Sequence, residues 1–380
     1  MEVVGKDRIY IPMEGDVGSR LLCECTPLPN GLPITSESDM VQAAPSETLS
    51  STPLGTGDLR VVSYNLLADY NLKQDVARGD PAALALDPET RDMQHRRQLL
   101  LRELVNYRAD ILCLQEVDRD SMYGDFLHGH LKHLGYEGVY ANKMHTSTPI
   151  GNAVFWNCSK LRLVDAETLD LTQGSEIQAL LEAAPTLGLA MSKTTTVANL
   201  VLLEDMSGKR FAVANLHLFG DPGAPHIRLL QTYIVLCAAA RHAAPLLLCG
   251  DFNCGPESGV FELLAFGAVN ENHPDWIRGG NFEWGAVGQK TLNWQSIPQE
   301  QWCAAMSLSH AFSLSTAGVP EYTYWNGRWG FVVDHIFLDA AFSVQSLAAV
   351  PPSELAQEYG APSTLFPSDH VAVVADICWN

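Results

Sequence analysis

The segment Leu246-Leu-Leu-Cys-Gly-Asp-Phe-Asn253 is the strongest structural signal in this chain. The apolar run with which it begins, residues 245–249 including the preceding Pro245, predicts a buried strand. Side chains two apart on an extended chain point to the same side, so Asp251 and Asn253 can reach one centre while Phe252 enters the core. A carboxylate beside an amide can bind and orient water. The same pattern is also typical of an ordinary polar turn after a strand.

Five further strand-like runs carry polar residues of the kinds used in catalysis. They are Asn65 after residues 61–64, Glu116 after 110–115, His217 after 211–216, Asp334 within 331–338, and Asp369 with His370 before 371–377. Taken singly, each is more typical of a solvated strand end or a buried core histidine than of a functional group. Six polar-tipped apolar runs in one chain favour a shared site.

The motifs SYN, LQEVD, GNAVFW, NLHL, GDFN, VDHIF and SDH occur in this order over residues 58–380. As a set they resemble the endonuclease/exonuclease/phosphatase superfamily of metal-dependent phosphodiesterases, and within it the deadenylase branch with its 2′,5′-phosphodiesterases. The resemblance implies an α+β fold, a four-layer α/β/β/α sandwich of two packed mixed or antiparallel sheets with outer helices (DNase I-like). Helices predicted over 91–107, 122–134 and 227–241, between strands, agree with that fold.

The resemblance also implies the metal ligands. Glu116 is the expected main ligand for Mg²⁺, with Asn65 beside it and Asp369 serving a second metal. Such oxygen ligands, with water in the open positions, suit Mg²⁺, and Mn²⁺ is expected to substitute.

The catalytic roles follow the same resemblance. Asp251 is expected to activate the attacking water, with Asn253 holding that water or the phosphate. His370 would contact the scissile phosphate while Asp334 fixes its orientation. His217 would stabilise charge on the phosphate, and the reaction would be in-line attack by water on a phosphodiester.

Three positions are expected to bind substrate by resemblance: Trp329 by stacking on adenine, Pro222 in the base pocket, and Asn152 in GNAVFW. Trp329 is also typical of a loop aromatic that shields the core, and Pro222 is more typical of an ordinary turn than of a base contact. His335 stands where the branch usually has Tyr, and Ile150 where relatives are often acidic. These two departures weaken predictions of fine substrate selectivity.

The charge balance limits the kind of partner. A net charge of −20, from 44 acidic and 24 basic residues, disfavours a protein that grips many phosphates along a nucleic acid. The basic residues within 91–98 are predicted to lie on the solvated face of a helix. The resemblance implies a 3′→5′ exoribonuclease, and the charge balance agrees with one that engages only a few nucleotides at an RNA or oligoadenylate 3′ end. The alternatives are a phosphatase or phosphodiesterase acting on a small nucleotide or phosphoinositide, and a catalytically inactive RNA-binding scaffold.

The chain organisation predicts an N-terminal β-sandwich remnant over 1–27, a Pro/Ser/Thr/Gly-rich linker over 28–57, and a catalytic domain over 58–380. The Trp-rich segment 267–303 either covers the site or packs on the surface. No apolar run is long enough to span a membrane, and no stable protein partner is predicted. Nine cysteines without zinc spacing favour an intracellular location, in the mitochondrial matrix by resemblance or in the cytoplasm.

Overall fold

The computed structural model describes residues 10, 12, 14–26, 31–41, 57–183, 185–270, 272–280, 283–284, 292–293 and 312–380. These belong to two compact units, Met1–Leu49 and Ser50–Asn380. No described helix is long and apolar enough to cross a membrane.

The first unit contains a short 3₁₀ turn, Glu14–Asp16, and an antiparallel hairpin of β1 (Arg20–Cys25) and β2 (Ile34–Met40). The prediction of a linker over 28–57 is therefore wrong for residues 34–40, which form β2. This segment is a strand because it supplies the hydrogen-bonding partner that β1 needs. The strand expected at 8–12 lies largely outside the described residues.

The second unit holds two six-stranded sheets. The first has the order β17-β18-β3-β4-β6-β5, with β3 and β4 parallel and the other neighbours antiparallel. Its strands are β3 (Leu59–Asn65), β4 (Ile111–Asp118), β5 (Tyr136–Asn142), β6 (Ile150–Asn157), β17 (Phe342–Leu347) and β18 (Val373–Trp379).

The second sheet has the order β13-β16-β10-β9-β8-β7, in which β9 and β10 are parallel and the other neighbours antiparallel. Its strands are β7 (Leu161–Asp170), β8 (Val197–Asp205), β9 (Arg210–His217), β10 (Leu246–Asp251), β13 (Leu314–Thr316) and β16 (Asp334–Asp339). Two small hairpins complete the strands: β11 (Glu283–Trp284) with β12 (Leu292–Asn293), and β14 (Tyr324–Trp325) with β15 (Gly330–Phe331).

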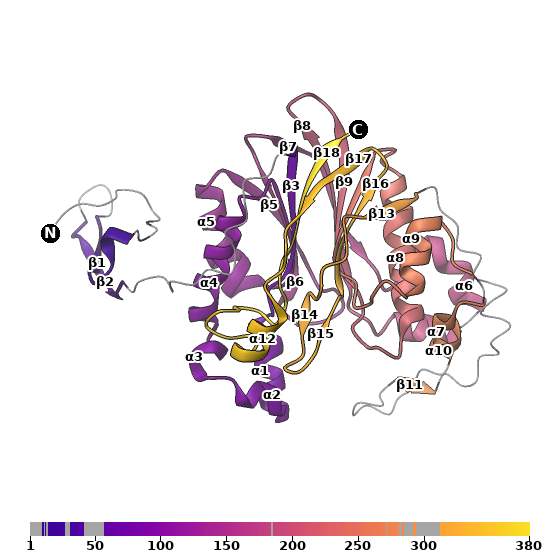
Figure 1. Cartoon of the computed structure of the whole chain (residues 1–380), viewed down its shortest axis with the longest axis horizontal. Helices are drawn as coiled ribbons and strands as arrows, with labels where there is room; N and C mark the ends of the chain where they lie inside the picture. Colours follow the sequence, from indigo (N-terminus) through magenta and orange to yellow (C-terminus); the bar gives the residue numbers. More distant parts are fainter. Residues whose placement is uncertain are drawn as a thin grey trace. The chain divides into compact units, whose positions relative to one another are not determined.

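Helices cover the outer face of each sheet, as Figure 1 shows. Against the first sheet lie α4 (Met93–Tyr107) and α5 (His128–His133), and against the second lie α8 (Pro225–Ala240) and α9 (Gly259–Phe266). The other helices of the described residues are α1 (Asp69–Arg78), α2 (Pro81–Ala85), α3 (Pro88–Arg91), a π-helix (Arg119–Leu127), a 3₁₀ turn (Ser175–Ile177), α6 (Gln178–Ala183), α7 (Pro185–Met191), α10 (Pro274–Gly280) and α12 (Ser353–Tyr359).

One apolar cluster lies under the helices of each sheet, and a third fills the space between the sheets. It combines fully buried residues of the first sheet, such as Val61 and Ile111, with Val213 and Leu247 of the second. Strands buried on both faces read as continuous apolar runs, which explains the strand signals in the sequence. The predicted four-layer α/β/β/α sandwich is confirmed.

Two local expectations need correction. The strand expected over 331–338 is divided between β15, which ends at Phe331, and β16, which begins at Asp334; the amides of Val333 and Asp334 donate to Thr323 Oγ1 at 2.9 and 3.0 Å. Within 267–303, Trp276 of α10 is 1% exposed and packs in the core beneath the second sheet. Most of the other residues of that segment lie outside the described part of the chain.

Candidate active site

The ends of four central strands meet at one edge of the two sheets. Asn65 ends β3, His217 ends β9 and Asp251 ends β10, while Glu116 lies near the end of β4. Asp334, the first residue of β16, is the register partner of Asp251. Because parallel neighbours bring their carboxyl ends to the same edge, residues far apart in the sequence converge here.

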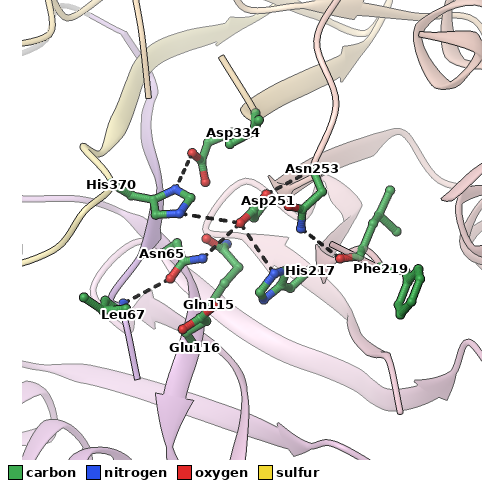
Figure 2. Close-up of polar contacts among 12 residues, drawn as sticks. Asn65, Leu67, Gln115, Glu116, His217, Phe219, Asp251, Asn253, Asp334 and His370 are labelled. Carbon is green, nitrogen blue, oxygen red and sulfur yellow. Dashed lines mark hydrogen bonds and ion pairs between the residues drawn. The ribbon is translucent and has the colours of Figure 1, made fainter. Parts of the chain in front are cut away.

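Asp251 lies at the centre of this group and is 2% exposed. Asn65 Nδ2 donates to its Oδ2 at 2.9 Å, and the Nε2 atoms of His217 and His370 lie 3.5 and 3.9 Å from the same oxygen (Figure 2). Burial and the neighbouring carboxylate of Asp334 raise the pKa of Asp251, against the opposing effects of the two histidines and Asn65. A buried carboxylate with a raised pKa is a stronger proton acceptor.

Gly250 allows β10 to carry Asp251 to this point. Its φ is +149°, and a Cβ there would lie 2.0 Å from the carbonyl oxygen of Leu216 in β9. Asn253 follows with φ +52°, and its backbone amide donates to Asp251 Oδ1 at 2.9 Å. Phe252 is fully buried in the core, as the sequence predicts.

His370 and Asp334 form a buried pair in which Nδ1 and Oδ2 are 2.8 Å apart. Burial by itself would lower the pKa of His370, but Asp334, Asp369 and Asp251 raise it to about 10. The ring is therefore an imidazolium at neutral pH, with both nitrogens acting as donors. The second oxygen of Asp334, Oδ1, is buried and has no hydrogen-bond partner among the described residues.

Glu116 reaches the site through a break in the β4–β6 ladder. The register shifts between Leu114 and Val117, and Glu116 itself has φ +52°. Such a bulge re-aims one side chain relative to its neighbours. Its Oε2 accepts hydrogen bonds from the amide of Ala68 at 3.0 Å and from Asn71 Nδ2 at 2.7 Å.

The electrostatic surroundings keep Glu116 ionised. Burial alone would raise its pKa, but His217 and Lys143, with the hydrogen bonds from Ala68 and Asn71, hold it below the ordinary value. The reverse holds for Asp369, since burial raises its pKa to about 6 against the effect of His370.

Beneath these groups, Gln115 and Asn215 join the two sheets. Gln115 Nε2 donates to Asn215 Oδ1 at 2.8 Å, and Asn215 Nδ2 donates to the carbonyls of Leu114 and Ala153 at 3.0 and 2.9 Å. Both side chains are fully buried. These buried hydrogen bonds between the sheets fix the relative position of the strands that carry the site.

A pocket of about 480 Å³ lies beside these strand ends. Six of the predicted residues line it: Glu116, His217, Asp251, Asn253, Asp369 and His370. The wall also includes residues that no sequence motif marks: Leu67, Tyr70, Asn71, Gln74, Asp75, Arg78, Lys143, Thr148, Thr195, Gly220 and Tyr324. Five of these belong to α1. Asp118 holds the start of this helix, because its carboxylate accepts from the amides of Asp69 and Tyr70 at 2.7 and 3.3 Å.

The three predicted substrate-binding residues do not line the pocket. Asn152 is 4% exposed, and its Nδ2 donates to the carbonyl of Val197 at 3.0 Å, so its amide joins β6 to β8. Asn152 therefore makes a buried structural contact outside the pocket wall, and a contact with substrate stays a prediction. Trp329 is 60% exposed in the β14–β15 turn, and Pro222 is exposed between β9 and α8.

The donor set fits a hard divalent cation. Asp251, Asp334 and His370 each offer an atom within 4.8 Å of the others. His370 is a poor metal ligand, because its Nδ1 is hydrogen-bonded to Asp334 and the protonated ring has no free nitrogen lone pair. Carboxylate and amide oxygens, such as those of Glu116, Asn65 and Asp369, are the donors that hard divalent cations prefer. A cation would relieve the repulsion between the half-buried Glu116 and Asp369.

Residues 62–370 match the Endonuclease/Exonuclease/phosphatase family. The chain is 32% identical to 2′,5′-phosphodiesterase 12 of Rattus norvegicus over 98% of its length and 62% of that protein. It is 28% identical to the CCR4-Not complex 3′-5′-exoribonuclease subunit Ccr4 of Mycosarcoma maydis, over 83% of this chain and 50% of that one. The chain therefore spans less than two thirds of the curated relatives it matches.

Among solved structures, ANGEL2, a 2′,3′-cyclic phosphatase bound to adenosine-2′,3′-vanadate, superposes with a TM-score of 0.66 at 24% identity. The match covers 84% of this chain and 95% of that one. This likeness concerns the fold. The strand-end motifs, the two-sheet sandwich and the matched length together show that the chain belongs to the endonuclease/exonuclease/phosphatase family.

Proposed function

We propose that this protein is a magnesium-dependent 3′→5′ exoribonuclease that hydrolyses adenylate-rich RNA ends, by poly(A) deadenylation, by 2′,5′-oligoadenylate cleavage, or by both. The observation that carries the proposal is the buried Asp251, held by Asn65 at 2.9 Å and placed between the His370–Asp334 pair and Glu116 in one pocket. A water-activating carboxylate, a cationic imidazole and a metal-binding carboxylate are the groups that phosphodiester hydrolysis requires.

Glu116, with Asn65 and Asp369, would hold Mg²⁺, and Mn²⁺ would substitute for it. A bound divalent ion supplies positive charge to the oxygens of the phosphate. Glu116 is suited to this role because its pKa is held below the ordinary value, so that it stays ionised near neutral pH. The oxygen Oδ1 of Asn65 already accepts from the amide of Leu67 at 3.0 Å and retains one lone pair.

Asp251 would accept the proton of the attacking water at a carboxylate oxygen, and Asn253 would hold that water or the phosphate. The imidazolium of His370 would donate from Nε2 to a phosphate oxygen, since its Nδ1 is fixed by Asp334 at 2.8 Å. His217, whose Nε2 lies 3.5 Å from Asp251, would add a second donor.

The RNA 3′ end is the proposed partner. Trp329, exposed at the tip of the β14–β15 hairpin, would stack on an adenine, and Pro222 would contact the same base from the β9–α8 loop. Tyr324 of the hairpin and Gly220 of the loop line the pocket, so both loops lead from the proposed base contacts to the reacting phosphate. The names of the relatives, a 2′,5′-phosphodiesterase and a 3′-5′-exoribonuclease subunit, agree with phosphodiester cleavage.

A second candidate keeps the same site but takes a small phosphate ester of a nucleotide or a phosphoinositide. The net charge of −20 favours it, because the chain offers few cations for a long polyanion. A catalytically inactive scaffold is disfavoured, since the acids, amides and imidazoles of the site are all present and most are in mutual contact.

One activity panel separates these functions. The chain is incubated with Mg²⁺ and with 3′,5′-oligoadenylate, 2′,5′-oligoadenylate, oligouridylate, a nucleotide 2′-phosphate and a phosphoinositide. We expect release of AMP from one or both oligoadenylates. Turnover of the small esters alone would establish the second candidate, and turnover of none would establish the scaffold.

We propose an intracellular location, in the mitochondrial matrix or the cytoplasm. The described cysteines are free thiols, as a reducing compartment favours. Fractionation of cells that express the tagged protein tests this location. Recovery of the protein from the medium would refute it.

A further inference from the structure

Arg96 is a fully buried cation of α4 that forms no ion pair with a carboxylate among the described residues. Its guanidinium instead donates to three backbone carbonyls. Nε donates to Pro367 O at 2.7 Å, and Nη2 donates to Leu66 O at 2.7 Å and to Leu67 O at 2.6 Å. A buried charge is costly, and the sequence predicts a solvated face for this stretch, so the position needs an explanation.

One side of this arrangement is the segment that follows β3. The amide of Leu67 donates to Asn65 Oδ1 at 3.0 Å, and the Nδ2 of the same Asn65 donates to Asp251 at 2.9 Å. The next amide, Ala68, donates to Glu116 at 3.0 Å. Leu67 has φ +53°, a left-handed conformation that a branched side chain adopts only when its surroundings enforce it.

The other side is the segment that leads into β18. Pro367 is followed by Ser368, whose Oγ donates to Asn65 O at 2.8 Å and accepts from the amide of His370 at 3.2 Å. A shift of Pro367 would therefore move His370 and the intervening Asp369 relative to Asn65. Arg96 joins the two segments because its Nη2 binds the segment after β3 and its Nε binds the segment before β18.

We propose that Arg96 is a positioning residue, which joins the Leu66–Leu67 and Pro367 carbonyls and thereby sets the geometry of Asn65, Glu116 and His370. The catalytic importance of these three side chains rests on the proposed function. The positioning itself does not depend on that function. Arginine suits the task because its planar fork presents donors in fixed, divergent directions, whereas lysine offers one compact charge on a flexible stem.

The chain offers a matched control in Arg60, which is also buried, at 6% exposed. Its Nε and Nη2 bind the carboxylate of Asp376 at 2.7 and 2.9 Å, and its Nη1 donates to Tyr107 O at 3.1 Å. Arg60 lies at the start of β3 and Asn65 at its end. Arg60→Lys therefore disturbs a buried guanidinium in the same domain without touching the site.

The experiment compares Arg96→Lys, Arg60→Lys and the unmodified chain by Mn²⁺ titration with electron paramagnetic resonance, by kcat on oligoadenylate and by thermal unfolding. We expect both variants to lose stability. Only Arg96→Lys should bind Mn²⁺ about tenfold more weakly, as loss of a supporting contact around a metal site does, with a parallel fall in kcat. Normal Mn²⁺ affinity in Arg96→Lys, or equal weakening in Arg60→Lys, would overturn the proposal.

Ser368→Ala keeps the proposal testable if Arg96→Lys does not fold, because it removes only the hydroxyl that contacts Asn65, Asp369 and His370. Weakened Mn²⁺ binding supports the positioning role, and unchanged binding refutes it. If the unmodified chain binds Mn²⁺ but cleaves no substrate, the proposed function fails, while the Mn²⁺ comparison still tests Arg96.

Discussion

His370 Nδ1 and Asp334 Oδ2 lie 2.8 Å apart. Both residues are buried, with 7% of His370 and 0% of Asp334 exposed to solvent. They come from strands and loops of different sheets, since Asp334 begins β16 and His370 precedes β18. The acid fixes which ring nitrogen faces the pocket and keeps the imidazole protonated. The pair gives the site a fixed cation opposite Asp251.

Asp334→Asn should lower kcat on oligoadenylate by about 10²–10⁴-fold, because the imidazole loses both its orientation and its charge. The pKa of His370 should fall at the same time, which a histidine titration by NMR can follow. Asp339→Asn, at the other end of β16, is the control and should leave kcat unchanged. Full activity in Asp334→Asn would show that the pair is structural.

Asp251→Asn should reduce turnover by about 10²–10⁴-fold while the protein stays folded, because it removes the proton acceptor but preserves the side-chain volume. Turnover and circular dichroism are measured on the same preparation. The exposed Asp165 of β7 provides the comparison, and its change to Asn should have no effect. If Asp251→Asn retains activity, another group activates the water.

Removal of divalent ions should silence hydrolysis. EDTA is expected to abolish AMP release, and excess Mg²⁺ or Mn²⁺ to restore it, because Glu116, Asp369 and Asn65 are hard oxygen donors. Glu116→Gln should raise the Mg²⁺ concentration needed for half-maximal activity. Hydrolysis that persists in chelator would contradict a metal-dependent reaction.

Trp329→Ala should weaken oligoadenylate turnover roughly tenfold, the loss of one stacked base, and should leave hydrolysis of a simple phosphodiester unchanged. Phe266, an aromatic on α9 that is 80% exposed, is the matched control. The ratio of kcat/KM values on the two substrates is the measurement. Equal losses on both would make Trp329 a structural residue.

The Arg60–Asp376 pair should make stability depend on pH. Burial raises the pKa of Asp376, but the hydrogen bonds from Arg60 and Ser346 outweigh it and hold the folded-state pKa below the ordinary value. The pair therefore stabilises the fold above the unfolded-state pKa of about 3.9, and this contribution is lost as pH falls through the lower folded-state value.

Asp376→Asn should accordingly cost about 3 kcal/mol at neutral pH, because Arg60 loses its carboxylate partner in the core. The difference from the unmodified chain should shrink as the pH falls below about 4. Urea unfolding at stepped pH measures it. A difference that stays constant down to the lowest pH at which both fold would refute the coupling.

The sequence by itself determined the sandwich and six of the residues that line its pocket. Strands buried on both faces need continuous apolar runs, and polar residues at their ends cannot enter the core, so local pattern marks both the strand and its tip. Asp251, His370 and Glu116 were found in this way.

The tertiary structure alone decided which of these tips touch. Asn65 and Asp251 are 186 residues apart, and their contact depends on how two sheets pack. The bulge at Glu116, the buried amide of Asn152 and the three carbonyls bound by Arg96 all depend on partners from other strands or loops. A helical arginine looks solvent-facing in sequence, because local periodicity records which face a residue occupies but not what lies opposite it.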